Sequence, residues 1–344
     1  MEHEQLADEF RAHLRCIHGQ PGGHAAVGAA LLRQALNVGL RSAKAYRRTM
    51  CAPEVALTFI VLEGLQDDLP DLVVRDIGGT NEEVTTGADW EWWIEGDRRW
   101  FRMLVQAKRA KASSGRRGGW EYALGQKVGK SGELQVDRLL QASHARGLPA
   151  IYALFNPSSA SGECTTARCP AMGECLPANA DGITTASAQT VKRLVDRAGE
   201  DVPLVDVRVE AVPWTCLVAC WKDCNIALPR TGRALAGPAV GLARALGYAN
   251  GVPDAADFAF HAAARVLALT AGSAFEGRAF DAALELVLTG FTEDPPLYIL
   301  EPAEDVIADA FAGVPNDLRP GQLVVLRKPA QEPDAEPPVR TAGP

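Results

Sequence analysis

The chain has 344 residues, 47% of them hydrophobic, and a formal net charge of −8. This is enough apolar material for one elaborated domain or two ordinary ones, and the acidic balance argues against a general binder of polyanions. No stretch supplies the roughly 20 uninterrupted apolar residues of a membrane span, and MEHEQLADEF at the N-terminus has acids where a signal peptide has bases. Eight cysteines in a chain without an export signal indicate a reducing compartment, so we expect a cytoplasmic protein.

Helical periodicity over residues 4–16 and 25–48 predicts a helical N-terminal region, residues 1–50. The next region, 51–156, begins with a helix that Pro53 opens and that ends before Pro70. Glu54 lies in its first turn. Strands are predicted at 72–76, 88–94 and 100–108, a loop at 112–119, a helix at 126–144 closed by Gly147, and a buried strand at 150–155. The order of helix, three strands, helix and strand predicts an α/β core.

Three further regions follow the predicted core. Residues 157–230 are predicted to contain a Cys-rich insertion and additional sheet elements. A helix is expected near 186–198 and a strand at 204–212. Residues 231–328 are predicted to be an α+β C-terminal part, with helices between 255 and 290 and strands at 297–300 and 323–326. The tail, 329–344, has five prolines and almost nothing to bury, so we expect it to be disordered.

A strong local charge lies inside this acidic chain. Residues 98–130 contain ten lysines or arginines and a single acid, Glu121, which gives the segment a formal charge of +9. Such a concentration of positive charge is expected where phosphates bind. A solvated basic loop is the alternative interpretation of the same segment.

Polar residues interrupt the two strands that should form a buried hairpin. Because side chains alternate along a strand, Asp89 shares a face with Glu91 and Trp93, and Gln106 shares a face with Lys108. If the strands pair, these polar sets meet at one end of the sheet. A carboxylate buried beside a lysine is costly unless something compensates it. A divalent cation would do so, and carboxylate, carboxamide and carbonyl oxygens suit Mg²⁺ or Mn²⁺.

An acid on the leading helix, Asp on the second strand and Gln-x-Lys on the third resemble the PD-(D/E)XK nuclease superfamily, in its Gln-x-Lys variant. The resemblance covers residues 51–156 and implies a restriction-endonuclease-like core, αβββαβ, with a mixed central sheet flanked by helices. It implies that Asp89, Gln106 and Glu54 bind Mg²⁺, with the Ala107 carbonyl beside them. Lys108 would orient or deprotonate the attacking water. The chain departs from the family pattern in having Ala88 before Asp89 and Gln106 where Glu is commoner.

The resemblance implies a Mg²⁺- or Mn²⁺-dependent endonuclease that hydrolyses DNA, in duplex form, as part of prokaryotic defence. Gln135 resembles a glutamine that related nucleases place near the site, although an exposed helix residue is an equal alternative. Other side chains are expected to bind the nucleic acid through its phosphates: Arg102, Arg109, Lys111, Arg116 and Arg117. The sequence leaves open whether the chain acts as a homo-oligomer or needs an activating partner.

Six cysteines form two groups that could share a structural zinc ion: Cys164, Cys169 and Cys175, then Cys216, Cys220 and Cys224. Only the second group has nearly the usual zinc-ligand spacing. Unligated thiols are the alternative. If zinc is bound and the polar hairpin is inert, the protein would instead be a catalytically inactive, zinc-stabilised module that binds nucleic acid or a protein.

Overall fold

The computed structural model describes part of the chain: residues 38, 54–68, 74–75, 86–96, 99–113, 119–128, 132–156, 182–217, 242, 245–246, 258–271, 278–293 and 322–326. Several predicted features lie outside these residues. They are the N-terminal helices except for Val38, the insertion up to residue 181, the strand at 297–300 and the tail from 329.

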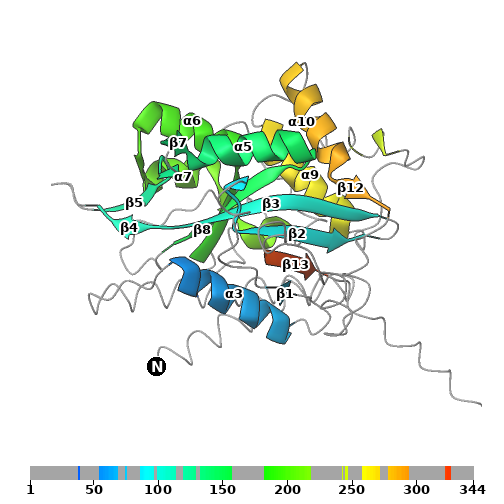
Figure 1. The fold of residues 1–344 in the computed structure, drawn as a ribbon, viewed down its shortest axis with the longest axis horizontal. Coiled ribbons are helices and arrows are strands. Elements are labelled where there is room, and N and C mark those ends of the chain that lie inside the picture. Colours follow the sequence, from blue (N-terminus) through cyan, green and yellow to red (C-terminus); the bar gives the residue numbers. More distant parts are fainter. Residues whose placement is uncertain are drawn as a thin grey trace, which may run out of the picture.

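One mixed sheet organises the described residues. Its strands are β1 (Val74–Arg75), β13 (Gln322–Leu326), β2 (Trp90–Glu95), β3 (Trp100–Arg109), β8 (Ala150–Phe155), β9 (Ile183–Ser187) and β11 (Val212–Pro213), in that spatial order, with β12 (Phe291–Thr292) paired to the start of β3. β2 and β3 are antiparallel, whereas β3 and β8 are parallel. The C-terminal β13 therefore lies in the sheet beside β2 (Figure 1), parallel to it.

Two smaller sheets stand beside the main one. One consists of β4 (Lys111–Ala112), β5 (Trp120–Ala123) and β10 (Asp201–Pro203), and the other is the β6–β7 hairpin (Lys127–Val128 and Glu133–Leu134). Gly125, just after β5, extends the pairing with the β10 side, because its N–H donates to the Glu200 carbonyl at 2.9 Å. β6 begins two residues later, at Lys127.

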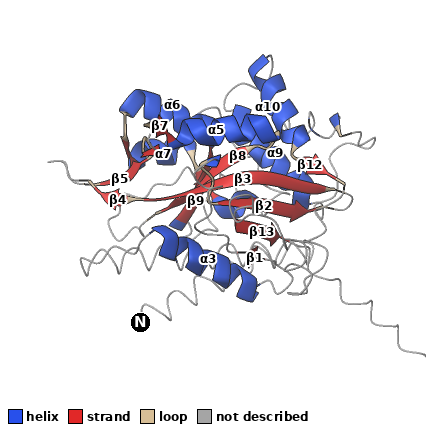
Figure 2. Cartoon of the chain, viewed as in Figure 1, coloured by secondary structure: helices blue, strands red, loops and turns tan. Residues whose placement is uncertain are grey.

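Helices cover the sheet on both sides (Figure 2). They are α3 (Glu54–Asp68), α5 (Gln135–Arg146), α6 (Ala188–Ala198), α7 (Leu204–Glu210), α9 (Phe258–Ala271) and α10 (Arg278–Thr289), with a short 3-10 helix at Trp214–Leu217. One buried cluster joins alternate β3 and β8 residues such as Leu104 and Tyr152 to α5 and α6. The other cluster joins Val105 and Ala107 to α3 and α9. This alternation confirms that β3 is buried on both faces, and the architecture is α/β with a mixed sheet.

The β2–β3 hairpin has the register expected from its alternation. Trp93 lies opposite Arg102, and Trp92 opposite Met103. The Arg102 guanidinium lies over the Trp93 ring, 4.9 Å from its centroid, while Trp92 packs on Trp214 with the ring centroids 5.5 Å apart. Large aromatic contacts of this kind fix the register, since a shift by one residue would exchange the two faces.

Two predicted elements are wrong. Residues 204–210, expected as a strand from their β-branched alternation, form α7, because Leu204, Val207 and Arg208 are buried at helical spacing against the second cluster. The helix predicted at 126–144 begins only at Gln135. Lys127–Val128 and Glu133–Leu134 form the paired strands β6 and β7 instead, and Gly132, at φ 68°, has a backbone conformation that a helix cannot use.

The predicted strand at 150–155, the helices between 255 and 290 and the helix end at Gly147 are confirmed. Gly147 has φ 61° and caps α5 in the left-handed conformation. None of the helices among the described residues is long and apolar enough to cross a membrane.

Candidate functional site

Asp89 lies immediately before β2 and is bound to the far end of β3. Its N–H donates to the Val105 carbonyl at 2.8 Å, and its Oδ2 accepts the Ala107 N–H at 2.6 Å. Gly87, two residues earlier, has φ 68° and lies so close to the first turn of α5 that an added Cβ would be 2.9 Å from the Gln135 carbonyl oxygen. Glycine at this point therefore lets the approach to β2 pass against α5 and brings Asp89 beside Gln135.

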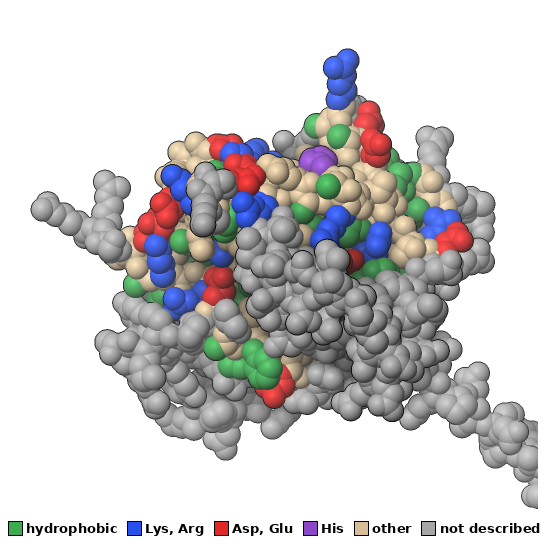
Figure 3. Space-filling view, in the orientation of Figure 1, with side chains coloured by type: hydrophobic (Ala, Val, Ile, Leu, Met, Phe, Trp, Pro, Cys, Tyr) green, Lys and Arg blue, Asp and Glu red, His purple; other side chains and the backbone are tan. Residues whose placement is uncertain are grey.

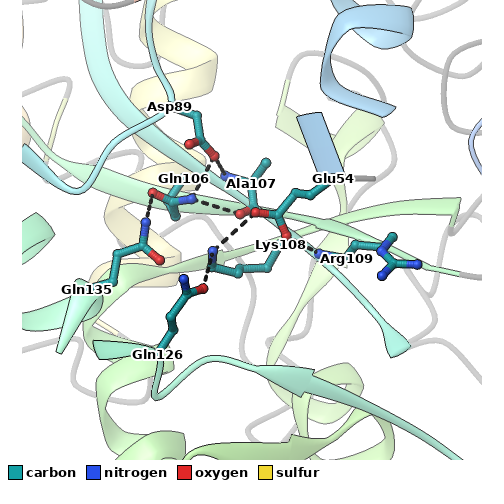
Figure 4. A network of polar contacts seen from close by, with 8 residues as sticks. All are labelled: Glu54, Asp89, Gln106, Ala107, Lys108, Arg109, Gln126 and Gln135. Carbon is teal, nitrogen blue, oxygen red and sulfur yellow. Dashed lines mark hydrogen bonds and ion pairs between the residues drawn. The ribbon is translucent and has the colours of Figure 1, made fainter. Parts of the chain in front are cut away.

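Gln106 is buried, with 1% of its surface exposed, and all of its amide atoms are bonded. Its Nε2 donates to Asp89 Oδ2 at 2.7 Å and to the Ala107 carbonyl at 2.9 Å. Its Oε1 accepts from Nε2 of Gln135 at 2.9 Å. A continuous chain of polar groups thus runs from the Asp89 carboxylate to the first residue of α5 (Figure 4).

Lys108 emerges from the same face of β3 and makes a second polar cluster. Its Nζ lies 3.2 Å from Oε1 of Glu54 and 3.3 Å from Oε1 of Gln126. Glu54 is the first residue of α3, and its Oε2 accepts the Arg109 N–H at 2.9 Å. One carboxylate therefore bonds to both the side chain and the main chain of β3 (Figure 4). The Lys108 side chain is only 7% exposed, whereas the Glu54 side chain is 30% exposed, so it is the amine that is withdrawn from water.

Tyr152 adds a buried phenol next to this network. It is the register partner of Gln106 on β8 and is fully buried. Burial, reinforced by the nearby carboxylates of Asp89 and Glu54, raises the pKa of its hydroxyl far above the usual value of 10, so it stays protonated. The hydroxyl finds no acceptor among the described residues.

The structure thus brings Asp89, Gln106, Lys108 and Glu54 together, with Gln135 in direct contact with Gln106. The expectation that Gln135 is an exposed helix residue is wrong, since only 5% of its surface is exposed.

Other predicted residues lie elsewhere. Arg102 is six residues from Lys108 along β3, about 20 Å at the usual rise of a strand, and packs on Trp93. Lys111 is paired with Asp201 at 2.7 Å and with Glu121 at 3.8 Å. Arg116, Arg117 and the insertion cysteines lie outside the described residues, and for Cys216 only the backbone is described.

Basic side chains are mixed with acidic ones on the face of the molecule drawn in Figure 3. Arg138 pairs with Glu133 at 3.0 Å, and Lys192 with Asp137 at 3.2 Å and Asp196 at 2.7 Å. The hydrogen bond to Asp196 raises the pKa of Lys192. Within the 98–130 segment the charge is also partly neutralised, since Lys108 pairs with Glu54 and Lys111 with Asp201, contacts that its sequence alone does not reveal.

Sequence reasoning missed Gln126 and Tyr152. The predicted helix at 126–144 includes Gln126, whereas the two glycines of KVGKSGE indicate a turn after it, and the chain returns so that the Gln135 N–H donates to the Gln126 carbonyl at 2.8 Å. Tyr152 reads as an ordinary residue of an apolar strand. That Tyr152 lies beside Gln106 can be recognised only from the register between β8 and β3.

The residue types at this site include oxygen donors of the kind that a hard divalent cation prefers, but in this state the Gln106 carboxamide directs its nitrogen toward Asp89. Within the described parts of the chain, no three His, Cys, Asp or Glu side chains gather as metal ligands. The oxygens here are instead of mixed type: the Asp89 carboxylate, the Gln106 carboxamide and the Ala107 carbonyl, with Glu54 on the Lys108 side. Such a set suits Mg²⁺ or Mn²⁺, which retain several waters. Oε1 of Gln135, buried and without a donor among the described residues, shows that the amide network is not fully satisfied in this state.

Residues 28–325 match the model of a family described as a family of unknown function, DUF6615. A comparison with curated proteins gave no match.

Proposed function

The chain belongs to DUF6615, a family of unknown function, and we propose that it is a Mg²⁺- or Mn²⁺-dependent DNA endonuclease acting in the cytoplasm. One observation carries the proposal. Asp89, Gln106 and Lys108 meet at one end of the β2–β3 hairpin, and Glu54 of α3 bonds to Lys108 and to the main chain beside it. These are the positions that the resemblance to PD-(D/E)XK nucleases assigns to catalysis.

The arrangement of elements supports the same proposal. α3, β1, β2, β3, α5 and β8 occur in the order expected of a restriction-endonuclease-like core, although β4, β5, β6 and β7 lie between β3 and α5. β2 and β3 are antiparallel and β3 and β8 parallel. One feature departs from the expected core, because β13 lies between β1 and β2. The C-terminal strand would then be an addition of this family to the nuclease sheet.

In this proposal Asp89, Gln106 and the Ala107 carbonyl would hold the cation. When bound, a divalent cation polarises a phosphate and lowers the pKa of water, which makes water a nucleophile near neutral pH. Nζ of Lys108 orients the attacking water, and Glu54 and Gln126 hold that nitrogen in place. One P–O bond would form to the water oxygen, which releases a proton to the surrounding water, and the P–O bond to the leaving oxygen would break as that oxygen takes up a proton from the surrounding water.

Double-stranded DNA is the proposed substrate, and defence against foreign DNA is the role that the resemblance implies. Arg109 directly follows Lys108, and its main chain is fixed by Glu54, so its side chain is the nearest candidate for an adjacent phosphate. Lys111 would have to exchange its contact with Asp201 for a phosphate oxygen. Phosphate contacts of this kind make binding sensitive to salt.

A plasmid-cleavage assay tests the proposal. The full chain should nick or linearise supercoiled DNA with Mg²⁺ or Mn²⁺ and not with excess EDTA. Asp89→Asn and Lys108→Met should each abolish cutting while circular dichroism and the melting temperature show a folded protein. Lys192→Met, at an ion pair of α6 on the surface, is the matched control and should cut normally.

Two results would contradict this function. Cleavage that survives both substitutions would remove these residues from the chemistry. Salt-sensitive DNA binding without turnover under any divalent ion would instead indicate a binding module.

A further inference from the structure

The orientation of the Gln106 carboxamide is fixed by its neighbours. Asp89 Oδ2 and the Ala107 carbonyl can only accept hydrogen bonds, and they lie 2.7 and 2.9 Å from the same amide atom, which must therefore be the nitrogen. The opposite atom, Oε1, receives the Gln135 Nε2 donor at 2.9 Å. In this state Gln106 presents its NH₂ group, not its oxygen, to the Asp89 carboxylate.

This orientation is unsuited to binding a cation. A carboxamide binds hard cations through its oxygen, because its nitrogen has no available lone pair. Gln106 must therefore turn its amide by about half a rotation to share a cation with Asp89. Without the cation, the turned Oε1 would face two other acceptors with no hydrogen between them, which is unfavourable in a buried site. The two orientations thus belong to the free and the cation-bound states.

Gln135 has the atom that the turned state requires. Its Oε1 is buried and has no donor among the described residues. If Gln106 turns, its NH₂ group points toward Gln135 and can donate to that oxygen. The backbone need not move, because the Gln135 N–H is held by the Gln126 carbonyl at 2.8 Å. Only the two side-chain amides turn, so that Gln106 becomes the donor and Gln135 the acceptor.

We infer that Gln106 and Gln135 form a coupled amide pair that turns when a divalent cation binds, with Gln135 as the positioning residue that sets the affinity for the cation. The inference rests on the proposed cation site. It also accounts for a neutral glutamine at a position where a carboxylate is commoner. Turning the Gln106 amide costs free energy, so the protein binds the cation more weakly, and Gln135 determines how large that cost is.

Replacing Gln135 with an isosteric acceptor tests the coupling. Gln135→Glu can no longer donate, so it favours the turned amide, with the Gln106 NH₂ group directed at the new carboxylate. Titration calorimetry of the full chain with Mn²⁺ should show a dissociation constant about tenfold lower, the equivalent of one net hydrogen bond. The melting temperature without cation should fall, and Mn²⁺ should raise it by more than it raises that of the wild type.

A double-mutant cycle separates this effect from simple attraction of the cation by an added charge. In a Gln106→Met background there is no amide to turn, so Gln135→Glu should change Mn²⁺ affinity by less than about twofold if it acts through Gln106. An undiminished tenfold effect in that background would show plain electrostatics and overturn the inference. An unchanged affinity in the Gln135→Glu single variant would do the same.

The wild-type protein supplies a second measurement that needs no Gln135 variant to fold. The side-chain NH₂ resonances of Gln106, identified by their absence in Gln106→Glu, should shift on saturation with Mg²⁺ as their acceptor changes from a carboxylate to a neutral amide. Resonances that stay in place on saturation overturn the amide turn alone, while Mn²⁺ binding and DNA cleavage leave the proposed function standing. If the wild type neither binds Mn²⁺ nor cleaves DNA, both fall together.

Discussion

Lys108 and Lys111 are three residues apart, each paired with a carboxylate, yet they lie in different environments. The Lys108 side chain is 7% exposed and contacts Glu54 and Gln126 at the end of the main sheet. The Lys111 side chain is 40% exposed and contacts Asp201, itself 45% exposed, in the small sheet. The Lys108 amine has been removed from water while Glu54, 30% exposed, keeps part of its hydration, whereas both members of the second pair are more exposed.

The comparison separates two reasons for keeping a charged pair. An exposed pair costs little to form and contributes little, typically less than about 1 kcal/mol. A buried pair loses hydration that its mutual attraction barely restores, and an apolar pair of similar volume often serves stability equally well. The Lys108 cluster is therefore hard to explain by stability alone. Its burial beside Asp89 and two amides is what a reaction site would require.

The largest expected effect is on DNA cleavage, which should depend on Lys108 and not on Lys111. Lys108→Met keeps the volume of the side chain and removes the charge, and DNA cleavage should fall by at least about 100-fold. The unfolding free energy should change by less than about 1.5 kcal/mol, because Glu54 retains the Arg109 N–H as a donor. Initial rates on supercoiled plasmid and urea unfolding measure the two quantities.

Lys111→Met is the matched substitution in the exposed pair and should leave the cleavage rate within about threefold of wild type at saturating DNA. Equal losses at both positions would contradict the division into a reactive and a structural pair. A collapse in the stability of Lys108→Met would show that the buried pair serves the fold.

The next effect concerns the backbone that assembles the buried network. Gly87→Ala must adopt φ 68° and would place Cβ 2.9 Å from the Gln135 carbonyl oxygen. We expect a loss of about 2 kcal/mol in unfolding free energy, from left-handed strain together with the close contact. Separating Asp89 from α5 should also reduce cleavage. Urea unfolding and the plasmid assay measure the two changes.

Gly132→Ala is the control for Gly87→Ala, since Gly132 also has φ 68° but no atom within 4 Å of an added Cβ. It should lose only about 1 kcal/mol, from strain. If the two variants lose the same stability, contact between the Asp89 segment and α5 does not matter.

Much of the fold around the site follows from local pattern. The alternation in WEWWIE and WFRMLVQAKR predicts a hairpin buried on both faces, and the strand at Ala150–Phe155 is short, apolar and bounded by Pro149 and Asn156. The hairpin places Asp89 opposite Gln106 by register alone. Local pattern therefore predicts the contact on which the site depends.

The remaining features depend on distant partners. Leu204, Val207 and Arg208 become helical because the second cluster covers their common face, which alternation of polarity cannot reveal. β13 is recognisable as a strand from QLVVL, but its place beside β2 depends on an association across more than 200 residues of chain. The Lys111–Asp201 pair, 90 positions apart, has the same origin.

Substitution of Gln126, which lies at the border between the buried and exposed regions, should have a smaller effect on cleavage. Gln126 is exposed, yet its Oε1 holds Lys108 Nζ at 3.3 Å. Gln126→Leu should lower the cleavage rate by about fivefold, the equivalent of a weak hydrogen bond that positions the amine. Gln141→Leu, at an exposed glutamine on α5 that bonds to Glu133, is the control and should cut normally. Equal rates for the two variants would remove Gln126 from the Lys108 cluster.

The smallest effect belongs to the exposed pair and depends on pH. The hydrogen bond that Lys111 donates to Asp201 raises the pKa of Lys111 above its ordinary 10.5. Because the folded-state pKa is the higher one, the stabilisation is complete below pH 10.5 and disappears as the pH rises through the folded value. Lys111→Met should therefore cost less than about 1 kcal/mol at pH 8, and the difference from wild type should vanish in strongly alkaline buffer or shrink in high salt. Urea unfolding at pH 8 and above pH 11 measures it. A loss of unfolding free energy that persists at both pH values would show that the Lys111 side chain stabilises the fold through packing of its aliphatic stem. The two lysines would then differ in how deeply they are buried, but not in how their charge is used.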